Sequence, residues 1–183
     1  MIALHGFFAQ AAAVGEASLT EISGCETEIE VLEIRCTSLG DFAEQGMRLS
    51  EDLVAGVIGR LEGVMPGSLN VVLEPEEALV WAQIGNGGDL LDTFVGLGSV
   101  LLEGIAVALS EILESESQFR GAALAEESEL MMLLKTHAPS DTLVFSTRLH
   151  IEVRDEVVSA VSHLLIEPKY LTQLLSALSA AVH

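Results

Sequence analysis

A short segment occurs twice in this chain, ninety residues apart. The stretch SLTEISG at residues 18–24 recurs as ALSEIL at residues 108–113, and each copy ends an apolar segment with helical periodicity. Extended backwards without a gap, the alignment pairs Gly6 with Gly96 and Ala9 with Ser99. A repeat of this kind indicates two versions of one structural unit, so any chemistry that the unit carries should occur twice or be lost twice.

Both halves begin with a similar helix and close with the same order of elements. Apolar residues recur in steps of three and four over 2–22 and 90–113, the pattern of a core-facing helix, and each half closes with a hairpin, a proline and a helix. The first half predicts a helix 2–22, strand 27–36, loop 40–50, hairpin strands 54–64 and 69–73 joined by a turn at 65–68, and a helix from Pro75. The second predicts a helix 90–113, short strand 119–123, helix 126–135, hairpin strands 143–153 and 157–166, and a helix from Pro168. We therefore expect one domain over 1–183 made of two repeats, about 1–86 and 87–183.

Two strands carry further signals. The alternation in the first strand changes phase at Leu32 and Glu33, which predicts a β-bulge. The cleanest alternation runs from Leu143 to Val153, and such a strand would promote self-association if it lay at an uncovered sheet edge. A homodimer through that edge is therefore an open alternative.

Charge and apolar run length restrict the partners. The chain has 28 acidic and 8 basic side chains, a formal net charge of −20, which repels nucleic acid and anionic lipid. The uncharged apolar stretches are interrupted and too short to cross a bilayer, and the N-terminus lacks a secretory leader pattern. We expect a cytoplasmic protein without nucleic acid binding or membrane insertion.

No cofactor or metal motif is visible. The five histidines are scattered without metal-ligand spacing, and the two cysteines lie at opposite ends of a predicted strand, too far apart to bridge. The glycines at 85–88 are followed by acidic residues, which disfavours a phosphate-binding loop. No nucleophile elbow is present either, so we expect no cofactor and no metal, and the residues alone leave the function open.

The order of elements and several short motifs resemble the CheC, CheX and FliY family of chemotaxis phosphatases over nearly the whole chain. The motifs are residues 18–24 leading into 28–35, Arg60-Leu61-Glu62-Gly63 with 69–73, Pro75-Glu76-Glu77-Ala78, the linker Gly87-Gly88-Asp89, and 143–151 with 164–175. The resemblance implies an α+β fold with pseudo-twofold duplication, in which long helices pack on an antiparallel sheet.

The same resemblance locates a catalytic site that this chain has lost. Members of the family use a Glu and an Asn three residues apart on each opening helix: the carboxylate contacts a lysine of the response regulator CheY, and the amide positions the attacking water. The corresponding residues here are Gly6 and Ala9, and Gly96 and Ser99, so neither half has the acid or the amide.

Two residues offer substitutes for the lost pair. Gln10 is one residue beyond the first amide position, which turns it about 100° away on a helix. Glu103 lies one turn after Ser99, so a rearranged Ser99 and Glu103 pair is conceivable.

Three hypotheses follow from the resemblance. The leading one is a CheC-like protein of chemotaxis or two-component signalling that binds a CheY-like response regulator or a related partner without phosphatase activity. The second is an active phosphatase with a rearranged site. The third is a structural or assembly subunit related to the FliY-type flagellar switch.

Overall fold

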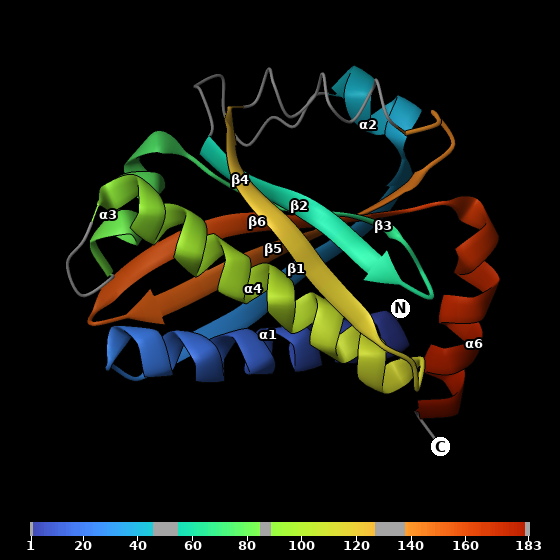
Figure 1. Cartoon of the computed structure of the whole chain (residues 1–183), viewed down its shortest axis with the longest axis horizontal. Helices are drawn as coiled ribbons and strands as arrows, with labels where there is room; N and C mark the ends of the chain where they lie inside the picture. Colours follow the sequence, from blue (N-terminus) through green and yellow to red (C-terminus); the bar gives the residue numbers. More distant parts are fainter. Residues whose placement is uncertain (1, 46–54, 85–88, 127–137, 182–183) are drawn as a thin grey trace.

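The computed structural model of the chain describes residues 2–45, 55–84, 89–126 and 138–181. A six-stranded antiparallel sheet carries a layer of two long helices, α1 and α4, on one face and the short helix α2 on the other (Figure 1). The elements are α1 Ile2–Ser23, β1 Thr27–Ser38, α2 Leu39–Gln45, β2 Ala55–Gly63, β3 Gly67–Leu73, α3 Pro75–Ile84, α4 Leu90–Ile112, β4 Ser117–Glu126, β5 Leu143–Val153, β6 Glu156–Ile166, a 3₁₀ turn Pro168–Tyr170 and α6 Leu171–Ala181. This is the α+β class that was predicted.

The strand order has pseudo-twofold symmetry. The sheet reads β1-β5-β6-β3-β2-β4, and exchanging β1 with β4, β2 with β5 and β3 with β6 reverses this order without changing it. The hairpin strands of the two halves therefore lie side by side at the centre, and the strand that follows each long helix forms an edge. The division into repeats near residue 86 stays a prediction, since residues 85–88 lie outside the described part.

Hydrogen bonds at the helix ends repeat with the same spacing of ninety residues. The backbone N–H of Thr27 donates to Thr20 Oγ1 at 3.2 Å, and the N–H of Ser117 donates to Ser110 Oγ at 2.9 Å. In each half the hydroxyl on the last turn of the long helix thus holds the first residue of the following strand. This bond links the residues of the repeated segment to the start of the sheet, which explains physically why a hydroxyl occurs in both copies.

Backbone geometry follows the same register. Gly24 and Glu114, ninety residues apart, both end a long helix with positive φ, at 66° and 48°. Leu32 is the extra residue of a bulge in β1, and the bulge in β4 falls at Gly121 and Ala122, between the paired positions Arg120 and Ala123. The predicted bulge in β1 is confirmed, and its counterpart in β4 was not foreseen.

The long helices bury most of the predicted stripe, with differences at its ends. In α4 the stripe from Phe94 to Ala108 is buried, whereas Leu90 is 58% exposed because it lies in the first turn, beyond the sheet contact. In α1 the stripe was wrong near its end: Leu19 is fully buried, and Ile22 is 46% exposed. The side chain of Asp89 caps α4 by accepting from the N–H groups of Leu91 and Asp92.

The helix α4 is long and apolar enough to span a bilayer by length and composition, which the interrupted sequence pattern did not suggest. About 56% of its most apolar window is buried inside the protein. Its buried side chains contribute to the same hydrophobic core as those of α1 and of the sheet, as is usual for a core helix.

The second hairpin is confirmed, and its placement answers the question of edge association. β5 pairs with β1 on one side and β6 on the other, so it is a central strand and offers no edge for dimerisation. Arg154 and Asp155 join β5 to β6 with φ of 57° and 65°, as the central residues of a type I′ turn require. The Arg154 guanidinium donates to Ser23 O at 2.6 Å and contacts Cys25 Sγ at 2.9 Å, which fixes the hairpin to the end of α1.

The first hairpin is confirmed, but its turn lies earlier in the chain than the predicted 65–68, because β2 ends at Gly63 and β3 begins at Gly67. Gly67 already belongs to β3, where it pairs with Leu61 and Ile166, so the connection ends before it. A β-carbon at this position would lie 2.1 Å from the carbonyl oxygen of Leu165, which explains the glycine by close strand approach rather than by turn geometry.

Two other segments differ from the prediction. The loop expected at 40–50 includes the helix α2, and the short strand expected at 119–123 extends to Ser117–Glu126. Most of the helix predicted at 126–135 lies outside the described residues, as do the glycines at 85–88. In α6, Leu174 and Leu178 are buried as expected, whereas Leu175 is 44% exposed.

A second, smaller core lies under α2 on the other face of the sheet. Leu39 and Phe42 of α2 pack there with apolar side chains of β3, β5 and β6. The same face holds the fully buried His163, whose Nδ1 lies 2.7 Å from Oδ1 of Asn70, with the Phe42 ring edge-on to the imidazole. Because an amide oxygen only accepts, the neutral ring donates from Nδ1. Burial lowers the pKa of His163 to about 4.

Candidate binding face on the helix pair

The helices α1 and α4 cross closely and run antiparallel. A β-carbon added at Gly104 would lie 2.5 Å from the carbonyl oxygen of Ala11, and one added at Gly15 would lie 3.3 Å from Leu101 Cδ2. Further along, the amide of Gln10 donates to a carboxylate oxygen of Glu111. The two helices therefore form one rigid layer, whose outward side is a single surface.

The two positions that the family resemblance aligns with the catalytic acid lie on this outward surface. Gly6 and Gly96 are exposed, and a β-carbon added at either glycine would meet no atom within 4 Å. Two other glycines of α4 are in the opposite situation: Gly98 faces Val57 and Gly104 faces the backbone of α1. Close packing accounts for Gly98 and Gly104, but packing gives no reason for glycine at positions 6 and 96.

The two positions that the resemblance aligns with the catalytic amide, Ala9 and Ser99, carry no amide. Ala9 is exposed and carries no polar group. Ser99 is partly buried, and its hydroxyl donates at 2.8 Å to the carbonyl oxygen of Val95 in the same helix. Gln10, the nearest amide in sequence, is bound to Glu111. Glu103 is exposed one turn beyond Ser99, and no hydrogen bond joins the two.

The charge of the helical layer is of one sign. The helices α1, α3, α4 and α6 contain no lysine or arginine, whereas α1 and α4 together carry Glu16, Glu21, Asp92, Glu103 and Glu111. The described arginines lie on strands or in the β5–β6 turn: Arg35, Arg60, Arg120, Arg148 and Arg154. This separation was visible in the sequence as a run without basic residues from 61 to 119, but only the fold shows that such segments share one layer.

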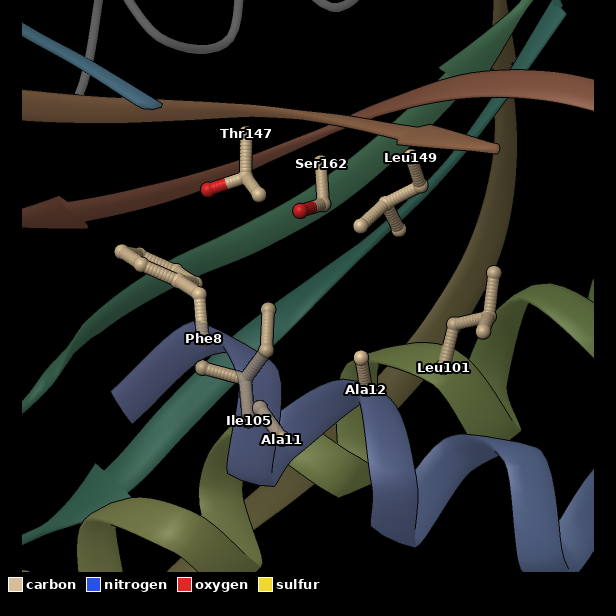
Figure 2. Close-up of a pocket in the computed structure, with 8 residues that line it drawn as sticks. All are labelled: Phe8, Ala11, Ala12, Leu101, Ile105, Thr147, Leu149 and Ser162. Carbon is tan, nitrogen blue, oxygen red and sulfur yellow. The ribbon is translucent and has the colours of Figure 1, made fainter. Parts of the chain in front are cut away.

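A small cavity lies between the helix pair and the sheet. Figure 2 shows side chains of α1 and α4 facing those of β5 and β6 across it, with the hydroxyls of Thr147 and Ser162 directed into the space. Its volume is about 20 Å³, and Thr147 Oγ1 has no hydrogen-bond partner in the described part of the chain. This space accepts about one water molecule and no organic ligand.

Two wider hollows lie at the surface, one over β5 and β6 and the other beside the end of α1. One, of about 300 Å³, is lined by Leu32, Arg148 and the carboxylates of Glu74 and Glu77, and Glu77 already accepts from the Ser159 N–H. The other, of about 310 Å³, adjoins Arg154 and four acidic residues. Among residues 2–45, 55–84, 89–126 and 138–181, no three His, Cys, Asp or Glu side chains are grouped to hold a metal ion.

The fold and this surface define a class: a two-repeat α+β protein with a helix pair on a pseudo-symmetric antiparallel sheet. No protein-family model matches the chain, and no curated protein matches its sequence. Solved structures nevertheless share the architecture, and the fold is that of the CheC, CheX and FliY family. The resemblance stated from the sequence motifs is thereby confirmed at the level of the fold.

Three solved structures illustrate the likeness. FliY from Thermotoga maritima is 13% identical with a TM-score of 0.75, covering 97% of this chain and 94% of that one. The FliM middle domain from Vibrio alginolyticus is 10% identical with a TM-score of 0.66, covering 96% and 99%. The CheX–CheY–BeF3–Mg complex from Borrelia burgdorferi is 16% identical with a TM-score of 0.51, covering 88% and 96%. At these identities the likeness concerns the fold.

Proposed function

We propose that this chain is a cytoplasmic, non-catalytic binding protein of the chemotaxis and flagellar-switch type, whose α1–α4 surface docks a CheY-like response regulator. The observation that carries the proposal is the state of the two catalytic positions. The described elements of both halves form the same scaffold, yet Gly6 and Gly96 present bare backbone where the family has its acid. A solved CheX of the same fold is in complex with CheY, which supports docking on this scaffold.

The absence of both functional groups argues against the rearranged phosphatase. Water positioning needs an amide or hydroxyl free to bind the attacking molecule, and displacement by about 1 Å can cost about 100-fold in rate. The hydroxyl of Ser99 donates back to Val95, and the amide of Gln10 is engaged by Glu111. Neither of these two groups is therefore free to position the attacking water.

A binding experiment with matched variants tests the docking surface. The ligand is the CheY-like regulator of the source organism, and titration calorimetry measures its affinity for the full chain. Ala13→Trp places a bulky ring on the exposed side of α1 and should abolish binding, whereas Gln173→Trp, which places the same ring on the exposed side of α6, should leave the affinity unchanged. Equal affinities for both variants would contradict docking on the α1–α4 surface.

A kinetic experiment tests the absence of catalysis. The regulator is first phosphorylated with a small-molecule phosphodonor. Its loss of phosphate is then followed in the presence and in the absence of this chain. We expect the same rate in both cases. Acceleration that Ser99→Ala removes would instead support the rearranged site and overturn the non-catalytic proposal.

The second candidate is a structural subunit of a flagellar switch. It is favoured by one observation: the TM-scores to FliY and to two FliM middle domains, 0.75, 0.66 and 0.65, exceed the 0.51 of the CheX structures. A subunit of this kind should self-associate or form a stable complex with switch proteins. Sedimentation of the purified chain, alone and with the switch proteins of its source, separates this role from that of a monomeric regulator-binding protein.

A further inference from the structure

The charges and hydrogen bonds of the α1–α4 surface affect whether it binds the phosphorylated or the unphosphorylated regulator more tightly. We infer that this surface prefers the unphosphorylated regulator and that phosphorylation weakens the complex. The inference rests on the proposed docking function. It concerns regulation of the same surface, and it is the reverse of what a phosphatase requires, since a phosphatase must engage the phosphorylated form.

The charge of the helical layer disfavours a phosphorylated partner. Acyl phosphorylation adds about one negative charge at the regulator's aspartate. The helical layer that would face it contains no lysine or arginine in α1, α3, α4 or α6. Its exposed acids include Glu103, one turn from Ser99 on α4, and Glu21 near the end of α1. A new negative charge brought to this layer therefore meets repulsion and no compensating cation.

Hydrogen bonding acts in the same direction. A phosphoryl group needs donors, and two polar side chains of this surface already donate within the helix pair: the Ser99 hydroxyl to Val95 O and the Gln10 amide to the Glu111 carboxylate. Arg154, the guanidinium attached to the end of α1, donates to Ser23 O and contacts Cys25 Sγ. The other side-chain N–H donor on α1 is the exposed imidazole of His5, next to Gly6, and the variant His5→Ala removes it.

Docking itself meets no structural obstacle on the described helix pair. Gly6, Ala9 and Ala13 of α1 and Gly96 of α4 are exposed and carry no charge themselves, so contact with a partner at these residues buries no charge of their own, although exposed Asp92 lies one turn before Gly96. The acids surround these small residues and attract the basic side chains of an unphosphorylated partner. For the unphosphorylated regulator, contact area and charge both favour binding. For the phosphorylated regulator, contact area favours binding and the added charge opposes it.

The magnitude follows from Coulomb's law. Two unit charges about 6 Å apart interact at about 0.7 kcal/mol in water, which corresponds to about a threefold change in affinity, and closer or less hydrated charges give more. We expect the beryllofluoride-activated regulator to bind about threefold to tenfold more weakly than the unactivated one at low ionic strength. The ratio should approach one in about 1 M salt, where the Debye length is about 3 Å.

Calorimetric titration of the full chain with the source organism's CheY-like regulator, with Mg²⁺ and with or without beryllofluoride, tests the inference. Glu103→Gln should reduce the preference for the unactivated form, and His5→Ala should not. The matched control Glu44→Gln removes a carboxylate from exposed α2 on the other side of the sheet and should leave the preference unchanged. Equal or tighter binding of the activated form would overturn this inference and leave the docking proposal standing. Failure of both forms to bind would overturn the docking proposal and the inference with it.

Discussion

The same substitution at two glycines of α4 should have opposite effects on stability. Gly104 faces the backbone of α1, where a β-carbon would lie 2.5 Å from the Ala11 carbonyl oxygen and 3.2 Å from the Gly15 nitrogen. Gly96, eight residues earlier in the same helix, has no atom within 4 Å of that position. Gly104→Ala and Gly96→Ala therefore differ only in the space around the added methyl group.

The expected magnitudes separate helix propensity from packing. Replacing glycine by alanine inside a helix stabilises by about 0.5–1 kcal/mol, and this contribution is common to both variants. At Gly104 the methyl group must displace backbone atoms, and overpacking of a close contact costs about 1–3 kcal/mol. Gly96→Ala should thus gain about 0.5–1 kcal/mol, and the two variants should differ by the full packing cost of about 1–3 kcal/mol.

Urea denaturation at one protein concentration measures both free energies of unfolding. Thermal melts should show the same order, with about 2–4 °C for each 1 kcal/mol in a chain of this size. A Gly104→Ala variant as stable as Gly96→Ala would refute the close crossing of α1 and α4, and with it the single rigid layer on which the docking surface depends.

Three further outcomes are expected. Burial lowers the pKa of His163 to about 4 from its usual 6.5, so between these pH values the unfolded state binds a proton that the folded state does not. The free energy of unfolding should therefore fall by about 3 kcal/mol from pH 6.5 to pH 4. His163→Gln should remove this part of the pH dependence, and the same change at partly buried His150 should not. Thr20→Ala and Ser110→Ala should each cost about 1–3 kcal/mol in urea denaturation, since each leaves the N–H of a buried strand residue without its acceptor. Ser99→Ala should change stability by less than about 0.5 kcal/mol, because its hydroxyl bonds only to its own helix.

The parts of the fold that were predictable from the sequence are those with strong periodicity or a special residue. Alternation over 143–153 located β5, a phase change at Leu32 located the bulge, and Pro75 and Pro168 marked the closing helices. Each of these signals reports a local requirement, namely the pleat of a strand or the missing N–H of proline. The repeat also allowed a prediction about distant segments. Two similar units that share one core are expected to pack about a pseudo-twofold axis.

What the sequence did not reveal depends on contacts between distant segments. The α2 segment contains Gly40 and Asp41, which favour a loop locally, yet Leu39 and Phe42 are held as a helix by the core beneath them. The position of β5 in the sheet follows from pairing with β1 and β6, which periodicity does not encode. The sequence named the four degenerate positions, but only the structure shows that Gly6 and Gly96 are open.

That openness raises a question about the glycines themselves. Each costs its helix about 0.5–1 kcal/mol relative to alanine, and neither is needed for packing. The two long helices each bear this cost once, at positions related by the repeat, which points to a reason outside the folded chain, and close approach of a partner's atoms to the helix backbone is such a reason. If it holds, the double variant Gly6→Ala with Gly96→Ala should be more stable than the natural chain and should bind the regulator about tenfold more weakly, because the methyl groups then fill space that the partner occupies. Unchanged affinity in titrations of this more stable variant would show that the partner does not contact the two glycines.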